Sequence, residues 1–446
     1  MTDRLIVIGG VAAGMSAAAK ARRTRKDMEI VVYEQTGYIS YGSCGFPYVI
    51  KGEIPRIQDV IVRTPQDFIK QNIFAHVRHQ VLEIDPQQHT LQVRNLETGA
   101  EFTDHWDRLI LSTGGSATRP PIPGLDLPGI FTLRNVEDTI AIHDWIARQR
   151  PQRGVIVGGG YIGLEMAEAL AAHGIQLTLV EMLPQVMGNM DADMAAHVQE
   201  ELVRQHVDLR LEHGVEAFVG NGRVREVVAA GQHFPADIVI FSVGVKPAAT
   251  LARAAGIALG PTGAVAVDDH QRTNVEQIWA AGDVAEALDL VTGKPTYVPL
   301  GTTANKQGRV AGENAAGGDA AFKGIVSTAV VKVFDCEAAR TGLSERHARA
   351  EGLDIETVTA TANSRAHYMP DHQSLHVKLV FERGSQRLLG AQMVGGEGVA
   401  KRIDVIAAAL HAHWTTYDLA ELDLSYAPPF APVWDPILVA ANLANR

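Results

Sequence analysis

Two stretches of the chain repeat the same order of hydrophobic and polar positions. In the first, the hydrophobic run Leu5–Ile8 precedes a glycine-rich turn, the mixed segment Met15–Arg25 and a second hydrophobic run, Glu29–Tyr33. The second stretch repeats this order in three segments: Val155–Val157, Leu164–His173 and Gln176–Val180. Short continuous hydrophobic runs are typical of buried parallel strands, and the longer segments between them suit helices. The pattern therefore predicts two strand–turn–helix–strand units, each able to bind a nucleotide.

The second turn carries the complete fingerprint of a Rossmann-like dinucleotide site. Gly158, Gly160 and Gly163 satisfy the spacing G-x-G-x-x-G. The first glycine permits the turn, the second lets a pyrophosphate approach the backbone, and the third allows the helix to pack closely on the strand. Glu181 ends the next predicted strand, where a carboxylate accepts hydrogen bonds from a ribose diol and repels a 2′-phosphate. We therefore expect NADH at this site and leave NADPH as an alternative.

The first turn departs from this spacing, because Val11 stands at the middle position between Gly9 and Gly14. Glu34 nevertheless supplies the acid at the end of the following strand. A third segment, Thr273–Asp283, combines a threonine, a hydrophobic strand and a terminal Gly-Asp. It resembles the second flavin motif of flavoproteins with two dinucleotide domains, in which the aspartate binds the ribityl-phosphate part. Together these segments predict FAD in the first unit.

Turn-rich segments mark the borders between the units. Thr113 and Gly114 open a glycine- and proline-rich crossover out of the first unit, and residues 243–247 form the crossover back. Beyond residue 321 the pattern changes to short alternating strands with one helix at residues 401–413. The predicted fold class is α/β, with two Rossmann-like domains and a C-terminal α+β domain. The predicted bounds are 1–114 and 246–321 for the FAD domain, 115–245 for the NAD(P)H domain inserted in it, and 322–446 for the C-terminal domain.

Composition excludes several other classes of protein. The chain has 446 residues, of which 46% are hydrophobic and 20% charged, as in globular proteins with several cores. Its formal net charge of -11 disfavours nucleic acid or an anionic membrane surface as a partner. The two cysteines, Cys44 and Cys336, give no disulfide framework, and glycines interrupt the N-terminal hydrophobic run too early for a membrane span. We therefore expect a cytoplasmic protein with no membrane segment.

Cys44 stands alone in the segment Ser40–Tyr48, between the two fingerprints. Two-electron disulfide chemistry needs two sulfurs, and no second cysteine follows within the next few residues. Cys44 must then find its partner outside the chain, as a mixed disulfide with a small molecule, a persulfide or a sulfenic acid. Fast attack at neutral pH requires a thiol pKa well below the ~8.5 of free cysteine, and we expect a following helix N-terminus and an adjacent flavin ring to lower it.

Over nearly its whole length the chain resembles the single-cysteine pyridine nucleotide-disulfide oxidoreductases. The resemblance rests on the two fingerprints, on the segment around Cys44, and on Gly282–Asp283, Pro299–Arg309 and Tyr426–Pro429. Within that group the chain is most similar to the coenzyme A-disulfide reductases, whose relatives include NADH oxidases, NADH peroxidases and persulfide reductases. The resemblance implies a homodimer with shared active sites, joined through the C-terminal domain. It also implies bound FAD, a nicotinamide nucleotide, and a mixed disulfide between Cys44 and coenzyme A.

Three residues bear on the choice among these relatives. Peroxidases and water-forming oxidases carry a histidine in the first glycine turn, where this chain has Ala12. Tyr368 and Tyr426 match two tyrosines of the coenzyme A-disulfide reductases that reach the active site of the other subunit. There a phenol can donate a hydrogen bond to a sulfur anion. The alternative for both residues is a structural role at a dimer interface, where tyrosine is common.

The resemblance further implies contacts to substrate and cofactors. The residues matched to coenzyme A contacts are Ser16, Lys20, Arg23, Ser40, Ser43, Asn305 and Arg309. Ser43 departs from the family, which usually has asparagine beside the cysteine. The basic residues that close the first helix also interact favourably with the helix dipole, so a role without any ligand stays open for them. Thr113, Gly114 and Glu165 are assigned to the cofactor sites, with Glu165 either facing the nicotinamide or stabilising its helix.

The hypothesis from the sequence is an FAD-dependent homodimer that uses NADH to reduce coenzyme A disulfide through Cys44. The alternatives are a persulfide or polysulfide reductase with the same thiol, a water-forming NADH oxidase, and a redox-sensing flavoprotein in which Cys44 is only modified. Cys336 matches no redox motif and is interpreted as a structural thiol. His367, His411 and His413 lack a third ligand at a suitable spacing, so no metal site is expected.

Overall fold

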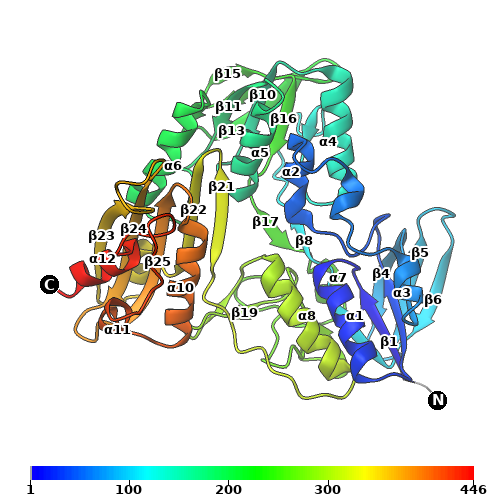
Figure 1. Ribbon diagram of the computed structural model, residues 1–446. Coiled ribbons are helices and arrows are strands. Elements are labelled where there is room, and N and C mark those ends of the chain that lie inside the picture. The colour runs from blue at the N-terminus through cyan, green and yellow to red at the C-terminus, as the bar shows by residue number, and fades with distance from the viewer. Residues whose placement is uncertain (1–2) are drawn as a thin grey trace.

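The first nucleotide-binding unit is a parallel sheet covered by helices in the computed structural model, which describes residues 3–446. The sheet has five strands in the order β18-β7-β1-β2-β3, all paired in parallel. The strands are β1 (Arg4–Ile8), β2 (Glu29–Tyr33), β3 (Ile73–His76), β7 (Arg108–Leu111) and β18 (Ile278–Ala280). Helices α1 (Ala12–Thr24) and α8 (Gly301–Ala315) lie side by side next to it (Figure 1). Leu5, Ile6 and Val7 are all buried, as expected for a strand with both faces covered.

The second unit repeats this architecture. Its sheet also has five strands paired in parallel, in the order β12-β11-β10-β16-β9. The strands are β9 (Ile130–Phe131), β10 (Arg153–Val157), β11 (Gln176–Val180), β12 (Asp208–Arg210) and β16 (Ile238–Phe241). The helices of this unit are α4 (Val136–Gln149), α5 (Tyr161–Ala171) and α6 (Ala192–Arg204). The predicted strands at residues 29–33 and 176–180 coincide with β2 and β11.

A paired crossover joins the two units. Strand β8 (Gly115–Ala117) leaves the first unit and pairs antiparallel with β17 (Val245–Pro247), which returns to it. Strand β18, which follows the return, completes the first sheet beside β7. The second unit is therefore inserted in the first, and the predicted fold class is confirmed. The exact residues at which the domains divide stay a prediction.

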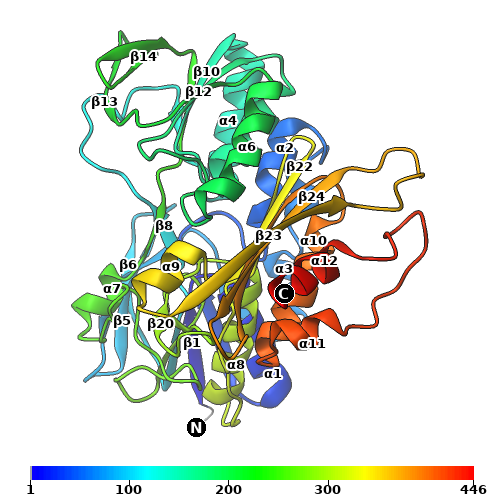
Figure 2. The same ribbon diagram turned by 90° about the vertical axis from the view of Figure 1, so that its left-hand side faces the viewer.

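The C-terminal part forms an antiparallel sheet with helices packed on it (Figure 2). The order of its five strands is β21-β22-β25-β24-β23. The strands are β21 (Ala329–Val333), β22 (Cys336–Gly342), β23 (Ile355–Asn363), β24 (Ser374–Glu382) and β25 (Leu388–Gly395). The helices are α9 (Glu345–Ala350), α10 (Val399–His411), α11 (Thr416–Ala420) and α12 (Pro436–Ala444). This arrangement confirms the α+β class predicted from the change of pattern.

The remaining elements are short. Two small antiparallel sheets consist of β4 (His79–Asp85), β5 (Thr90–Asn95) and β6 (Glu101–His105), and of β13 (Val215–Gly220), β14 (Val224–Ala229) and β15 (Gln232–Pro235). The others are β19 (Ala287–Leu288), β20 (Pro295–Thr296), α2 (Phe46–Lys51), α3 (Pro65–Ile69) and α7 (Thr250–Ala254). None of the helices within residues 3–446 is both long enough and apolar enough to cross a membrane.

Both fingerprint helices begin earlier than predicted. Helix α1 starts at Ala12 rather than at residue 15, and α5 starts at Tyr161 rather than at residue 164. The third glycine of each fingerprint therefore lies inside the first helical turn. A Cβ atom on Gly14 would lie 1.8 Å from the carbonyl oxygen of Gly9, so only glycine lets the helix start this close to the strand.

A buried ion cluster joins the second unit to the C-terminal sheet. Lys378 on β24 is 5% exposed at its side chain and lies 3.0 Å from Asp193 and 2.8 Å from Glu345. It also lies 3.4 Å from Asp191, the residue that precedes α6. Asp191 accepts hydrogen bonds from the backbone of Glu345 and from the side chain of Gln392 as well. Three carboxylates thus surround one buried ammonium group at the contact between the two parts.

We expect Lys378→Met to destabilise the protein, because the substitution leaves Asp191 buried without its cation. Removing one partner of a buried pair costs about 3–5 kcal/mol. The thermal midpoint of unfolding should fall clearly. The matched control is Lys401→Met, since Lys401 is 89% exposed in its pair with Asp404 and such surface pairs contribute at most about 1 kcal/mol. Equal midpoints for the two variants would show that the buried cluster does not hold the parts together.

Candidate functional site

The two predicted acids hold the two glycine turns in the same way. Glu34 accepts a hydrogen bond from the backbone N–H of Gly10 at 2.7 Å, and Glu181 accepts one from Gly159 at 2.7 Å. The second oxygen of each acid accepts a backbone N–H two residues further along the chain, at 2.8 and 2.9 Å. Each carboxylate is thereby fixed at the end of its strand, beside the place where a ribose would lie.

Two serines at the glycine turns escaped the sequence analysis. The hydroxyl of Ser112 donates to the carbonyl oxygens of Ile8 and Gly9, at 2.8 and 3.0 Å. The hydroxyl of Ser242 donates to the corresponding carbonyls of the second unit, at 3.1 and 3.2 Å. Both serines follow a hydrophobic strand and precede a glycine by two residues, so comparing the two units with each other could have found them.

The first turn also explains the departure at its middle position. Val11 precedes α1, and its side chain packs against the hydrophobic core that α2 and α5 share. A side chain at this position therefore contributes a contact between the two units. At Gly160, the corresponding residue of the second turn, a Cβ atom would meet no other part of residues 3–446 within 4 Å, so that turn is open.

Both turns fit dinucleotides. In the described part of the chain, neither α1 nor α5 has a side-chain cap or an acid in its first turn, so their N–H groups can bind pyrophosphate. Asp283 pairs with Arg134 at 3.3 Å, and burial raises the pKa of its carboxyl group. The Nε atom of Arg134 is buried without a hydrogen-bond partner among residues 3–446, as expected beside a polar ligand. Thr113 bonds the carbonyl oxygen of Ala248, across the crossover that Gly114 begins.

Cys44 lies in a single 3₁₀ turn (Ser43–Gly45) that leads directly into α2. The residue retains exposed surface, yet the surrounding protein raises the pKa of its thiol. Burial is the largest cause, followed by the negative charges of Glu165 and Asp283. In the polypeptide alone, burial and two carboxylates outweigh any effect of the short helix on this pKa. A pKa lowered jointly by the helix and an adjacent flavin ring stays a prediction.

Glu165 faces the helix that follows Cys44. A small cavity between α2, α5 and β21 is lined by Pro47, Tyr48, Lys51, Glu165, Glu168 and Lys332. Burial, reinforced by the charge of Glu168, raises the pKa of Glu165 to about 7. The charge of this carboxylate therefore changes near neutral pH, and its ionised form disfavours the Cys44 thiolate.

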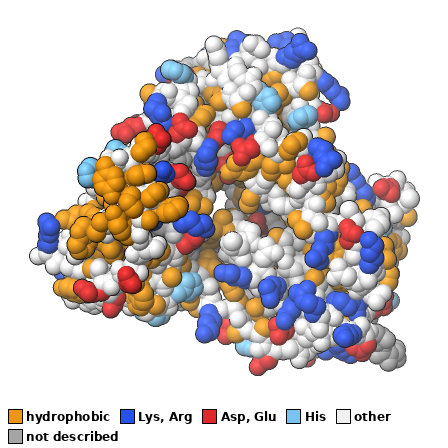
Figure 3. Space-filling model, in the orientation of Figure 1, with side chains coloured by type: hydrophobic (Ala, Val, Ile, Leu, Met, Phe, Trp, Pro, Cys, Tyr) orange, Lys and Arg blue, Asp and Glu red, His pale blue; other side chains and the backbone are white. Residues whose placement is uncertain are grey.

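Five of the seven residues matched to coenzyme A contacts lie on α1 and α8, where Figure 3 shows a group of Lys and Arg side chains. They are Ser16, Lys20, Arg23, Asn305 and Arg309. The hydroxyl of Ser16 donates to the side-chain oxygen of Asn305 at 2.6 Å. Lys20 is paired with Glu313 at 2.8 Å, which neutralises one of the expected cations. Arg23 and Arg309 are exposed.

Ser40 and Ser43 lie apart from that helix pair, in the segment that carries Cys44. The backbone of Ser40, at a φ of 50°, accepts a hydrogen bond from Val62 and donates one to Gly10. Ser43 is exposed in the turn of Cys44, and its side chain acts to lower the pKa of the thiol.

The two predicted tyrosines form a pair on the C-terminal part. The hydroxyl groups of Tyr368 and Tyr426 are 3.4 Å apart, and the residues are 62% and 48% exposed. No hydrogen bond within residues 3–446 joins either of them to the Cys44 segment of the same protomer. Phe430, Val433 and Trp434 are exposed nearby in sequence, and Figure 3 shows a broad hydrophobic patch over this part. Such a patch is typical of a protein–protein interface.

Two further features lie outside the predicted site. Cys336 is buried, and mainly because of this burial the pKa of its thiol rises to about 12. A thiol of this kind is inert, as expected for a structural cysteine. Asp268, Asp269 and His270 lie close enough to share an ion, but both ring nitrogens of His270 are already paired with Asp269 and Asp319. The expectation of no metal site stays a prediction.

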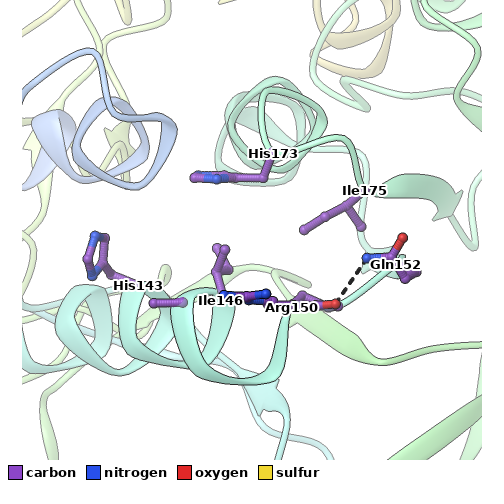
Figure 4. A pocket seen from close by; sticks show the side chains of 8 residues that line it. His143, Ile146, Arg150, Gln152, His173 and Ile175 are labelled. Carbon is purple, nitrogen blue, oxygen red and sulfur yellow. Dashed lines mark hydrogen bonds between the residues drawn. The ribbon is translucent and has the colours of Figure 1, made fainter.

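A hollow of about 400 Å³ lies between α4 and the segment that follows α5 (Figure 4). Its lining residues are His143, Ile146, Ala147, Arg150, Pro151, Gln152, His173 and Ile175. None of the predicted site residues, all of which fall within the described chain, belongs to this lining. His173 connects it to the Cys44 region, because its ring nitrogen Nε2 lies 2.6 Å from the carbonyl oxygen of Ile50 in α2.

Two family models cover most of the chain. The model "Pyridine nucleotide-disulphide oxidoreductase" matches residues 3–308, and the dimerisation domain of the same family matches residues 328–436. Together with the two dinucleotide turns and the inserted second unit, these matches define an oxidoreductase with two nucleotide-binding units. The chain belongs to the pyridine nucleotide-disulphide oxidoreductase family.

Named relatives come from archaea and bacteria. The chain is 41% identical over 440 residues to the CoA-dependent NAD(P)H sulfur oxidoreductase of Pyrococcus abyssi, covering 98% of this chain and 97% of that protein. It is 34% identical to the coenzyme A disulfide reductase of Staphylococcus haemolyticus, over 96% of each protein. Its fold matches the crystal structure of reduced Bacillus anthracis CoADR-RHD with a TM-score of 0.97, at 39% identity and covering 100% of this chain and 80% of that one.

We expect Glu165→Gln to lower the pKa of Cys44, because the substitution removes a negative charge that opposes the thiolate. Glu165 is ionised above its own pKa of about 7, so the difference from the unmodified protein should grow as the pH rises through neutrality. The measurement is the alkylation rate of Cys44 against pH in the protein freed of cofactors, followed by peptide mass. Glu53→Gln serves as control, because Glu53 is an exposed acid held by Lys51. If the midpoint of the alkylation rate against pH is the same as in the unmodified protein, Glu165 does not influence the pKa of Cys44.

Proposed function

We propose that this protein reduces coenzyme A disulfide with NAD(P)H, through a mixed disulfide between Cys44 and coenzyme A. The observation that carries the proposal is the solitary exposed thiol of Cys44, set between two dinucleotide turns with no second sulfur beside it. The names of the Pyrococcus and Staphylococcus relatives, which mention coenzyme A, support the choice of substrate.

The chemistry assigned to Cys44 balances as two thiol–disulfide steps. The Cys44 thiolate attacks one sulfur of coenzyme A disulfide, the S–S bond breaks, and the first coenzyme A leaves as a thiolate. Two electrons then break the bond between Cys44 and the second coenzyme A, which regenerates the Cys44 thiolate. Bound FAD would carry these two electrons from the nicotinamide to the sulfur. Overall, NAD(P)H, one proton and the disulfide give NAD(P)⁺ and two molecules of coenzyme A.

Each cofactor is assigned to one turn. FAD would be held by Gly9, Gly14 and Glu34 together with Asp283, which Arg134 orients. The nicotinamide nucleotide would be held by the second turn and by Glu181. Because a fixed carboxylate at that place repels a 2′-phosphate, we infer a preference for NADH over NADPH.

Coenzyme A would bind along α1 and α8. Arg23 and Arg309 are exposed cations suited to its phosphate groups, and Ser16 and Asn305 already form a polar pair between the two helices. This local positive surface would attract an anionic substrate to a protein whose formal net charge is -11. Lys20 would contribute only if it released Glu313.

A second function uses the same thiol on a coenzyme A persulfide or on polysulfide. The Pyrococcus abyssi relative is named as a sulfur oxidoreductase that depends on coenzyme A, and this name favours the second candidate. The attacked sulfur would then be the terminal one, and hydrogen sulfide would be released in place of the second coenzyme A.

Cys44→Ser should abolish NADH consumption with coenzyme A disulfide, because serine cannot form the mixed disulfide. We expect a loss of at least ~1000-fold in kcat/KM, about 4 kcal/mol of transition-state stabilisation.

The intact mass of the unmodified protein with and without reductant shows which group Cys44 carries. Comparing rates on the disulfide, the persulfide and oxygen ranks the candidates. Turnover that survives the substitution would eliminate this mechanism.

A homodimer would bring Tyr368 and Tyr426 of one protomer to Cys44 of the other, as the dimerisation domain suggests. Tyr426→Phe should then leave the rate at which NADH reduces the bound flavin unchanged, because that half-reaction needs no thiolate leaving group. Disulfide turnover should fall by roughly 10- to 100-fold through loss of one hydrogen bond to a sulfur anion. Stopped-flow absorbance separates the two half-reactions. Equal slowing of both would contradict the role assigned to the phenol.

A further inference from the structure

The helix that follows Cys44 belongs to a different core from Ile39, which lies five residues before Cys44. Ile39 is part of the core of the first nucleotide-binding unit. Phe46, Val49 and Ile50 of α2 are buried instead with Leu164 of α5 and with Val331 of β21. Figures 1 and 2 show α2 among the helices of the second unit, away from α1. The chain therefore passes from the first core to the second between Ile39 and Tyr41, and Cys44 lies within the segment that belongs to the second core.

One carboxylate joins the far end of α2 to two other parts of the molecule. Glu168 of α5 accepts hydrogen bonds from the Lys51 ammonium at 2.8 Å and from the Lys332 ammonium at 2.9 Å. Its second oxygen accepts the backbone N–H of Phe334 at 2.9 Å. Lys51 ends α2, whereas Lys332 and Phe334 belong to β21 and the turn after it. A single side chain of the second unit thus binds α2 and the C-terminal sheet.

The electrostatics of Glu168 suit a permanent anchor. Its side chain is 11% exposed, and burial alone would favour the neutral acid. The hydrogen bonds from Lys51 and Lys332 outweigh that effect, so the pKa of Glu168 lies below its usual range. The pKa of Lys51 is raised, first by Glu168 and then by Glu53. Both partners therefore stay charged around neutral pH.

A second contact reinforces the first at the same end of α2. His173, just beyond the end of α5, holds the carbonyl oxygen of Ile50 through its Nε2 atom. The final residues of α2 are therefore bound at two points, by α5 and by the segment directly after it. Because α2 is only six residues long, a displacement of its end is passed to the turn that carries Cys44.

We propose that Glu168 is a positioning residue for Cys44. Glu168 binds Lys51 at the end of α2 and Lys332 on β21. It thereby fixes the position of α2, and hence of the Cys44 sulfur, relative to the second nucleotide-binding unit. The proposal rests on the proposed function only in taking Cys44 as the sulfur that reacts. Within residues 3–446, Glu168 makes no hydrogen bond to the sulfur or to a predicted cofactor residue, although it lines the same small cavity as Glu165.

The test is Glu168→Gln, which keeps the shape of the side chain and removes its charge. In the purified protein with its native cofactors, amide hydrogen exchange of residues 46–51 should accelerate by roughly ten-fold, because a charge-assisted contact is lost. Alkylation of Cys44 is measured well above the pKa of about 7 of Glu165, so that this acid is ionised with either residue at position 168. It should also become faster, since a looser α2 reduces the burial that raises the thiol pKa. Cys336 is buried and does not compete. For disulfide turnover, kcat should fall while KM for NADH stays unchanged.

Glu53→Gln is the matched control, because Glu53 also binds Lys51 at 2.8 Å but is 57% exposed. It should alter neither exchange nor alkylation. Lys332→Met, which removes only the connection to β21, provides a second variant should Glu168→Gln fold poorly, and we expect it to accelerate exchange to a smaller extent. A lower thermal midpoint with unchanged exchange of α2 and unchanged alkylation would overturn the proposal. Exchange and alkylation need no disulfide substrate, so failure here is distinct from failure of the proposed activity.

Discussion

The structure depends on how closely a helix can approach the strand before it. In each nucleotide-binding unit a glycine inside the first helical turn lies against the carbonyl oxygen of the glycine that follows the strand. A Cβ there would come within 1.8 or 2.0 Å of that oxygen. This approach turns the first N–H groups of the helix toward a common point. The serine that follows a neighbouring strand donates a hydrogen bond to the same carbonyl. The acids, the turns and the predicted nucleotide sites all follow from this one contact.

Much of the fold could be predicted because its signals are local. The hydrophobic runs of β1 and β10, the acids at the ends of β2 and β11, and the change to alternating strands near residue 322 all lie within short windows of sequence. The insertion of one unit in the other also follows, because β18 carries the same strand signal after the second unit has ended.

The environment of Cys44 could not be predicted, because it depends on pairs distant in sequence. The sequence places a lone sulfur before a short helix, and this suggests a lowered pKa. Burial, followed by the negative charges of Glu165 and Asp283, reverses that effect. Glu165 lies 121 residues beyond Cys44 in the sequence and comes close to it only because α5 packs beside α2. The partner of Lys20 was missed for the same reason, since Glu313 lies on α8 and only the packing of α1 against α8 brings the two charges together. Counting charged residues in the sequence gives the sign of the net charge of a surface. It does not show which charges are neutralised by an ion pair, as Lys20 is by Glu313.

Val11 shows what happens when a repeated unit is used twice in one chain. Gly160, the equivalent residue in the second unit, leaves open space, whereas Val11 fills space against the neighbouring core. The first turn therefore carries a side chain that packs against the neighbouring core, whereas the second turn leaves the same position open. The two turns are therefore not equivalent. Glycine at position 11 would restore the standard motif, but it would remove the contact between Val11 and the core that α2 and α5 share.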